Sequence, residues 1–328
     1  MEKTASSFGQ KLRAYMSRNG NKNVVLLIFY LILQTIFFSV ATKTFLTGNN
    51  MENLVRQTAE LGMVCIPLSM ILITGNIDLS IGSVMGVCAI SMAWMLKWGY
   101  SIPVVLLLGM AIGVVVGSIN GFMVAKLHLA GIVVTIGTQV MLRGVCYILT
   151  GGRPVSGLPR EFIQISKLKF CGLSLSFLVM MVMFIIVIII MEYTSVGVKI
   201  HAIGYNPKTS IYSGISADKI KFVLFLVSGA VAAIASFFML MRFGSAESEF
   251  ANGYDTNALT AVLLGGISIT GGSGNMFGTL LGLIAVAMLK NGLTHMGMSS
   301  TNQQFILGLH RADHRQHRRL HLRISHPT

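Results

Sequence analysis

Long apolar runs are the feature that most restricts what this chain can fold into. Nine runs follow one another, at residues 24–42, 54–73, 77–96, 102–122, 132–150, 173–191, 220–241, 258–269 and 276–293. A hydrocarbon core of about 30 Å takes roughly 20 helical residues to cross. Because lipid offers no hydrogen-bond partners, a spanning segment must satisfy its own backbone, as a helix does. The runs therefore predict an all-α, polytopic integral membrane helical bundle of about nine to ten transmembrane helices, and the alternating pattern of a β-barrel is missing.

Composition excludes a soluble protein. Charged residues make up 11% and apolar residues 53% of the 328 residues, and the mean hydropathy is +0.72. A soluble domain usually has about a quarter of its residues charged. The net charge of +14 is assigned to membrane topology and to the C-terminal tail, so no nucleic acid partner is expected. Three of the four cysteines lie in apolar runs, and they predict neither a disulfide framework nor a metal site.

The charges between the runs predict the orientation. Residues 1–23 carry five basic residues and one acidic residue, and are expected to form a cytoplasmic N-terminal segment. The run at 24–42 is expected to be a retained helix rather than a cleaved signal peptide. Alternating crossings then place the lysines of 199–221 inside and the acidic residues of 247–255 outside, whereas the basic loop 151–172 disagrees with this threading. The predicted location is the bacterial cytoplasmic (inner) membrane, with the lipid bilayer as surroundings.

Two sets of glycines recur at four-residue spacing. On a helix this spacing lines one face with bare backbone, so that a neighbouring helix can approach closely. Helix packing is therefore the predicted role of Gly109, Gly113, Gly117 and Gly121, and of Gly274, Gly278 and Gly282.

Polar residues interrupt the apolar pattern between the second and third runs. Asn76, Asp78 and Ser80 are unfavourable in a plain hydrophobic helix, so a broken helix is predicted here. The Asp78 carboxylate is expected either to cap the second half of that helix or to contact a solute. Arg143 and Glu60 are the other strong charges well inside runs, and each is expected to find a partner within the bundle. We assign Asn76, Asp78, Ser80 and Arg143 to a translocation path or helix break.

No catalytic residues are predicted. The chain has no Gly-x-x-x-x-Gly-Lys-Ser/Thr phosphate loop, so it is not expected to hydrolyse ATP or to bind a cofactor, and a partner chain would have to supply the energy. Two other classes remain open. One is an ion-coupled secondary carrier with Asp78 and Glu60 as its ion site, and the other is a membrane scaffold that transports nothing.

Several blocks of sequence resemble a known family. The string "ITGNIDLSIGS" at 73–83 resembles the "TGGIDLSVGS" signature of permease subunits in ribose-type bacterial ABC importers. Further blocks at 117–155, 196–215 and 258–282 are similar to that family, and the resemblance extends over residues 24–309, the expected permease domain. The chain departs from the family at 129–132, where prolines are missing, and at Thr209 and Ser210, which replace paired alanines.

The resemblance implies a bundle of about ten helices that pairs with a second copy or a sister permease. It also implies two cytoplasmic ATPase subunits, which would use ATP and Mg, and an extracytoplasmic solute-binding protein. The residues that match the family's ATPase-coupling loop are Gly204, Asn206, Pro207, Lys208 and Gly214. Pentoses, hexoses, rhamnose and autoinducer-2 are all solutes of such families, and the sequence does not choose among them.

The tail at 310–328 does not fit the family. It holds five of the eight histidines and contributes +4 of the net charge of +14, where a tenth apolar helix should follow. Shifting the reading frame forward by one nucleotide permits Ile-Val-Leu-Ile-Ile-Val-Ser-Ile from His310. We therefore expect the tail to result from a frameshift. A metal site or a lipid-binding tail is the alternative, because His310, His314, His317 and His321 share one helical face.

Overall fold

The computed structural model describes residues 21–170, 172–298 and 303. The tail at 310–328 and most of the expected cytoplasmic segment 1–23 lie outside this part of the chain. Most of the described residues are helical, with one short two-stranded sheet formed by β1 (Lys169–Phe170) and β2 (Leu173–Ser174). The prediction of an all-α bundle is confirmed.

Seven helices of the described chain are long and apolar enough to cross a membrane. They correspond in order to seven of the nine apolar runs. Their bounds are α2 (Asn21–Ala41), α3 (Gly48–Ile73), α5 (Ile102–Ala125), α6 (Gly131–Thr150), α8 (Leu175–Tyr193), α11 (Ala217–Phe243) and α13 (Met276–His295).

The other two apolar runs form shorter helices. The third run forms α4 (Ile81–Lys97), a helix of 17 residues that begins four residues later than the run. The eighth run was expected to span but forms α12 (Tyr254–Leu264), a helix of 11 residues. At 1.5 Å per residue α12 is about 16 Å long, half of the hydrocarbon thickness. Glycines at 265 and 266 follow it, and the chain leaves the helix there.

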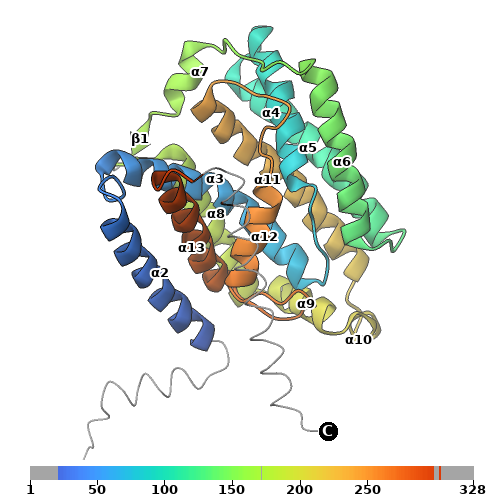
Figure 1. The fold of residues 1–328 in the computed structure, drawn as a ribbon. Helices are drawn as coiled ribbons and strands as arrows, with labels where there is room; N and C mark the ends of the chain where they lie inside the picture. The colour runs from blue at the N-terminus through green and yellow to red at the C-terminus, as the bar shows by residue number, and fades with distance from the viewer. Residues whose placement is uncertain (1–20, 171, 299–302, 304–328) are drawn as a thin grey trace, which may run out of the picture.

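Two ends of the bundle can be distinguished in Figure 1. One end, here called the α9 end, carries α9 (Ser195–Tyr205), α10 (Pro207–Tyr212) and the beginning of α2. The opposite end, here called the α7 end, carries α7 (Arg160–Ile165), the β1–β2 hairpin and the segment 244–253. The basic loop 151–172 and the acidic segment 247–255 thus share one end, joined by the bridge between Val155 and Ala246.

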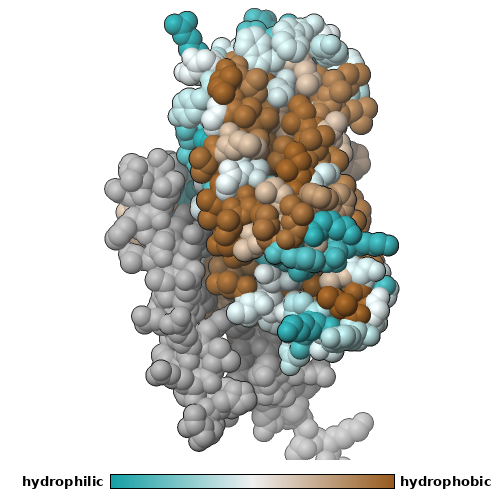
Figure 2. Space-filling view, turned by 90° about the vertical axis from the view of Figure 1, so that its right-hand side faces the viewer, coloured by the Kyte–Doolittle hydropathy of each residue, from teal (hydrophilic) through white to brown (hydrophobic). Residues whose placement is uncertain are grey.

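Burial separates central helices from peripheral ones. In α3, 89% of the apolar window is buried, against 22% in each of α2, α5 and α6. Side chains such as Leu107, Val115 and Val140 are more than half exposed, although they are fully apolar. Figure 2 shows the resulting hydrophobic surface over one side of the molecule. An exposed apolar belt of this kind faces lipid tails rather than water.

The glycine stripe of α5 packs against α11. Methyl groups built on Gly113 and Gly117 would overlap the carbonyl oxygens of Gly229 and Phe225, and one on Gly121 would lie 3.0 Å from the oxygen of Phe222. The pairing runs antiparallel. Gly109 differs, because it faces the side chain of Met92 on α4.

The second glycine set is only partly helical. Gly278 and Gly282 lie on α13 and contact the backbone of α12 at Gly265 and Ala261. Gly274 precedes α13 and has a φ of +133°, a conformation that suits glycine alone. Its predicted place on a helical stripe is therefore wrong, since the helix begins at Met276.

Candidate functional site

The first helix break lies between α3 and α4. Helix α3 ends at Ile73, Gly75 turns the chain with a φ of +81°, and α4 begins only at Ile81. Ser80 occupies the N-cap position, because α4 begins at Ile81. The Asp78 carboxylate, two residues before Ser80, accepts the backbone N–H of Ser80 at 3.0 Å. An interruption between the two helices is present, but the second helix begins at Ile81 rather than near Asn76 or Asp78, and its N-cap is Ser80 instead of the expected Asp78.

Asp78 forms the centre of a buried hydrogen-bond cluster, here called the Asp78 hub. Its Oδ1 atom accepts the Ser80 hydroxyl at 2.6 Å, and its Oδ2 atom accepts the Ser228 hydroxyl of α11 at 2.8 Å. Asn120 of α5 donates to the Ser80 hydroxyl oxygen at 2.9 Å and accepts the Thr138 hydroxyl of α6 at 2.6 Å. The hub therefore ties the break to three spanning helices.

The donors of the hub are neutral. Within the described residues, the ion pairs of carboxylates involve Glu52 and Glu60, not Asp78. A buried polar group is costly unless it is hydrogen-bonded, and here both carboxylate oxygens have partners inside the protein. The carboxylate thus fixes the geometry of the break and offers no unused oxygen to a solute. Asn76 lies nearer the α9 end, half-buried, and donates to the Thr74 hydroxyl oxygen at 3.2 Å.

A second interruption, here called the second break, is the loop between the antiparallel helices α12 and α13. Residues 265–275 leave the helix, and the side-chain oxygen of Asn275 then caps α13 by accepting the N–H of Gly278 at 2.6 Å. The two breaks touch, because the N–H of Gly272 donates to the carbonyl oxygen of Ile73 at 2.8 Å. Both interruptions adjoin α9, because a methyl group built on Gly204 would overlap backbone atoms of Ile73 and Gly272.

Glu60 and Arg242 form a buried ion pair. The Nε and Nη2 atoms of Arg242 each donate to one carboxylate oxygen of Glu60 at 2.7 Å, and the Tyr254 hydroxyl approaches the same carboxylate at 3.3 Å. Ser228, which contacts Asp78, and Arg242 lie on the same helix, fourteen residues or about 21 Å apart. Asp78 and Glu60 therefore belong to separate clusters and do not share one cation.

Arg143 holds the segment between α11 and α12. Its Nη1 atom donates to the carbonyl oxygens of Ser248 at 3.0 Å and Phe250 at 2.9 Å. One turn away on each side, Gln139 donates to Asp255 at 3.2 Å and Tyr147 donates to Glu249 at 2.8 Å. Three side chains at four-residue spacing on α6 thus hold this segment, and Arg143 does not pair with Glu60.

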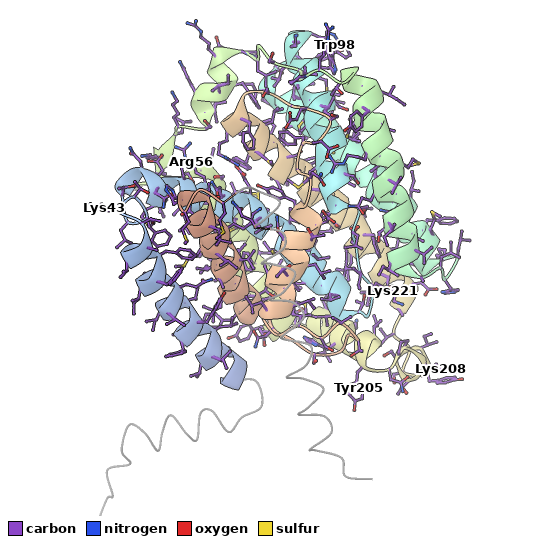
Figure 3. The ribbon with its side chains drawn as sticks, in the orientation of Figure 1. Lys43, Arg56, Trp98, Tyr205, Lys208 and Lys221 are labelled. Atoms are coloured by element: carbon purple, nitrogen blue, oxygen red, sulfur yellow. The ribbon has the colours of Figure 1, made fainter. Side chains whose placement is uncertain are left out.

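The residues of the predicted coupling loop lie at the α9 end. Asn206 ends α9 and caps α10, where its side-chain oxygen accepts the N–H of Thr209 at 3.1 Å, and Pro207 occupies the first turn of α10. Gly214 closes α10 with a φ of +76°. Figure 3 shows Lys208 and Tyr205 projecting from this end, both exposed, with Trp98 at the opposite end.

Sequence reasoning missed several members of these clusters. They share one signal, a polar residue inside an apolar helix, which is costly in a membrane unless it has a partner. They are Asn120, Thr138, Ser228, Gln139, Arg242 and Tyr254. Within the described residues, no group of three histidine, cysteine, aspartate or glutamate side chains could hold a metal ion.

Known proteins match most of the chain. Residues 50–310 match the family described as branched-chain amino acid transport system / permease component. The ribose import permease protein RbsC of Bacillus subtilis is 32% identical over 85% of this chain and 87% of its own length. The autoinducer 2 import system permease protein LsrC of Salmonella typhi is 31% identical over 87% of this chain and 80% of its own. No solved structure matches significantly.

The matches agree with the architecture described above. The probable ABC transporter permease protein YphD of Escherichia coli is 30% identical over 91% of this chain and 89% of its own length. The family match stops at residue 310, where the His/Arg-rich tail begins. The extent of the family match, together with seven candidate spans, shows that this chain belongs to the permease family described as branched-chain amino acid transport system / permease component.

Proposed function

We propose that this chain is the membrane-spanning subunit of an ATP-driven importer for a sugar or sugar-like solute. The observation that carries the proposal is the α9 end, where two short helices expose Tyr205, Lys208 and Tyr212 beyond the spanning helices. Aromatic residues such as these tyrosines are enriched in protein interfaces, and the polar rim of an interface accommodates a lysine. Because the chain has no phosphate loop of its own, an ATP-driven permease of this kind would need a separate ATPase. We propose that this cytoplasmic ATPase binds at the α9 end.

Further partners follow from the same assignment. The α7 end would face outside and receive the solute from a binding protein, and a second copy or sister permease would complete the path. Mg and ATP would be bound by the ATPase. The solute class rests on relatives named for ribose and autoinducer 2, although the family description names branched-chain amino acids.

The ion-coupled carrier is the weaker hypothesis. Its proposed ion site needs Asp78 and Glu60 together, but the two carboxylates sit in separate clusters. Glu60 is already neutralised by Arg242. Both oxygens of Asp78 accept hydrogen bonds from the protein.

Reconstitution tests the proposal. The chain is placed in liposomes with an ATPase and a binding protein of the same importer, for which neighbouring genes are the first candidates. Uptake of ribose, autoinducer-2 and leucine is then measured with and without ATP. We expect ATP-dependent uptake of a sugar-like solute and none without the ATPase. Uptake driven by a proton or sodium gradient in the chain alone would favour the carrier, and ATP-driven uptake of leucine alone would overturn the solute class.

A matched pair of variants tests the partner surface. Lys208→Glu reverses a charge on α10, and Lys43→Glu reverses one on another exposed lysine away from the α9 end. We expect the first to reduce co-purification of the ATPase and the second to leave it unchanged. Equal co-purification with both variants would place the ATPase contact elsewhere.

A further inference from the structure

Three backbone segments meet at Gly204 with no side chain between them. A methyl group built on Gly204 would overlap the carbonyl oxygen of Ile73, the last residue of α3, and the amide nitrogen of Gly272, in the second break. The N–H of Gly272 donates to that same Ile73 oxygen at 2.8 Å. Helix α9 therefore rests directly on both helix breaks.

Neighbouring contacts extend this junction. His201, one turn before Gly204 on α9, is hydrogen-bonded through Nδ1 to the carbonyl oxygen of Gly272 at 3.2 Å. A Cβ atom on Gly271 would lie 2.7 Å from the amide nitrogen of Gly75, so the two breaks also pack backbone to backbone. Gly75, Gly271 and Gly272 all have positive φ, a conformation that side chains other than glycine rarely adopt.

The junction lies between an exposed end and the buried Asp78 hub. On one side, Tyr205 and the residues of α10 other than Ser210 are exposed. On the other side, the first break runs from Ile73 to Asp78, and the second leads into α13. Close-packed backbone has no flexible side chain to absorb a shift, so a displacement of α9 has to move its neighbours.

We propose that Gly204 is a positioning residue through which α9 moves both helix breaks together. The proposal rests on the function proposed above, because it assigns the route from the ATPase-facing end to the transport path. Gly204 acts through its backbone contacts with Ile73 and Gly272, and the ATPase is contacted by the exposed residues that follow it. The consequence for the hub is a coupled shift of Asp78 and α4 whenever α9 moves.

Transport stoichiometry in the complete, reconstituted transporter gives the first test. Gly204→Ala inserts a methyl group into the junction, and we expect the amount of solute moved per ATP hydrolysed to fall about tenfold or more. His201→Ala removes one hydrogen bond without adding atoms, and we expect a fall of about two- to fivefold. Gly137→Ala is the control, because Gly137 lies on α6 with nothing within 4 Å of the added methyl group.

A labelling experiment separates this inference from the proposed function. In a background without native cysteines, Asn76→Cys places a single thiol in the first break. The rate at which a water-soluble thiol reagent labels it reports the accessibility of this break. We expect ATP to change the labelling rate of the thiol at position 76 when Gly204 is present, and to leave it unchanged with Gly204→Ala although the ATPase still co-purifies.

Each other outcome is informative. An ATP response that persists in both Gly204→Ala and His201→Ala, with unaltered stoichiometry, overturns the role of the junction. No ATP response in the Gly204 parent, with the ATPase bound, overturns it as well. Failure of the ATPase to co-purify with the parent contradicts the proposed function itself and with it this inference. Since His201→Ala adds no atoms, misfolding of Gly204→Ala alone does not prevent a decision.

Discussion

The Asp78 carboxylate binds three donors, which come from a backbone amide and two hydroxyl groups. Two explanations of its importance can be separated by mutation. If the hydrogen bonds matter, an amide of the same shape can replace the carboxylate. If the negative charge matters, the amide fails as completely as a methyl group does. The neutrality of every donor favours the first explanation.

We expect Asp78→Asn to fold almost as stably as the parent. Its carbonyl oxygen can accept both donors of Ser80, and its NH2 group can donate to the Ser228 hydroxyl oxygen. Asp78→Ala leaves three buried donors without an acceptor, and should cost roughly 2–5 kcal/mol of stability. Thermal unfolding in detergent, followed by size-exclusion chromatography, measures both variants. Equal damage by the two substitutions would show that the charge itself is required.

Glu60 and Arg242 lend themselves to a double-mutant cycle. Removing one partner leaves a buried charge alone, so Glu60→Gln or Arg242→Met should each destabilise the protein by about 3–5 kcal/mol. The double variant should lose less than the sum, because neither charge then remains unpaired. Denaturation in mild detergent gives the three free energies. Additive losses would mean that the pair contributes nothing beyond its separate side chains.

Some residues of the two buried clusters could be identified from the sequence, and others could not. Asp78 is recognisable because a carboxylate stands at the beginning of an apolar run, shortly after Gly75 and Asn76. Its partner Ser228 is 150 positions away on α11 and looks ordinary between apolar neighbours. Hydropathy also leaves Arg242 near the end of a run, where a cation usually reaches the interface. Pairing between distant helices depends on the packing of the whole bundle, which local pattern does not contain.

At the scale of helices, α5 and α11 approach each other closely along a face of glycines. Spacing predicted a bare face on α5, but not which helix covers it, and it included Gly274, which lies outside any helix. The apolar run at 258–269 has twelve residues, about 18 Å as a helix, so its length already indicated that α12 does not span. Glycines 265 and 266 were the available signal for the early end of α12.

Gly113→Ala should destabilise the bundle by about 1–3 kcal/mol, because the added methyl group overlaps the Gly229 carbonyl oxygen and forces the helices apart. Gly137→Ala makes the same chemical change on α6 where nothing lies within 4 Å. The melting temperatures of the two variants in the same detergent measure the difference. A Gly113→Ala protein as stable as Gly137→Ala would mean that α5 and α11 are less closely packed than described.

For the whole molecule, sidedness is the property that charge predicts and geometry alone does not. The α9 end is expected in the cytoplasm. In intact cells, and in a background without native cysteines, Lys208→Cys should resist a membrane-impermeant thiol reagent until the membrane is permeabilised. Lys43→Cys, on the α2–α3 connection, should react at once. If Lys208→Cys reacted at once and Lys43→Cys were protected, the orientation in the membrane would be inverted, and the ATPase contact would lie at the α7 end.

The tail at 310–328 is also a whole-molecule question. We propose that it arises from a reading-frame change, because the family match stops at residue 310 and an apolar continuation exists in the next frame. Resequencing the gene should reveal one nucleotide gained or lost near codon 310, followed by an apolar helix. An unaltered frame, with the same His/Arg tail in independent isolates, would rule the frameshift out and return attention to metal or lipid binding.

The short helix α12 also has a consequence for how the chain is made. Eleven residues cannot be released into lipid by the insertion machinery as a separate segment, because they reach only half-way through the hydrocarbon. These residues therefore need a surface of the protein to pack against. The segment leading into α12 lies against Gly82 and Gly86 of α4 and the side chains of α6. Those surfaces are synthesised much earlier than the segment that rests on them. Folding in the membrane therefore has an obligatory order. The first half of the permease, which includes α4 and α6, must be assembled before α12 in its last third can pack.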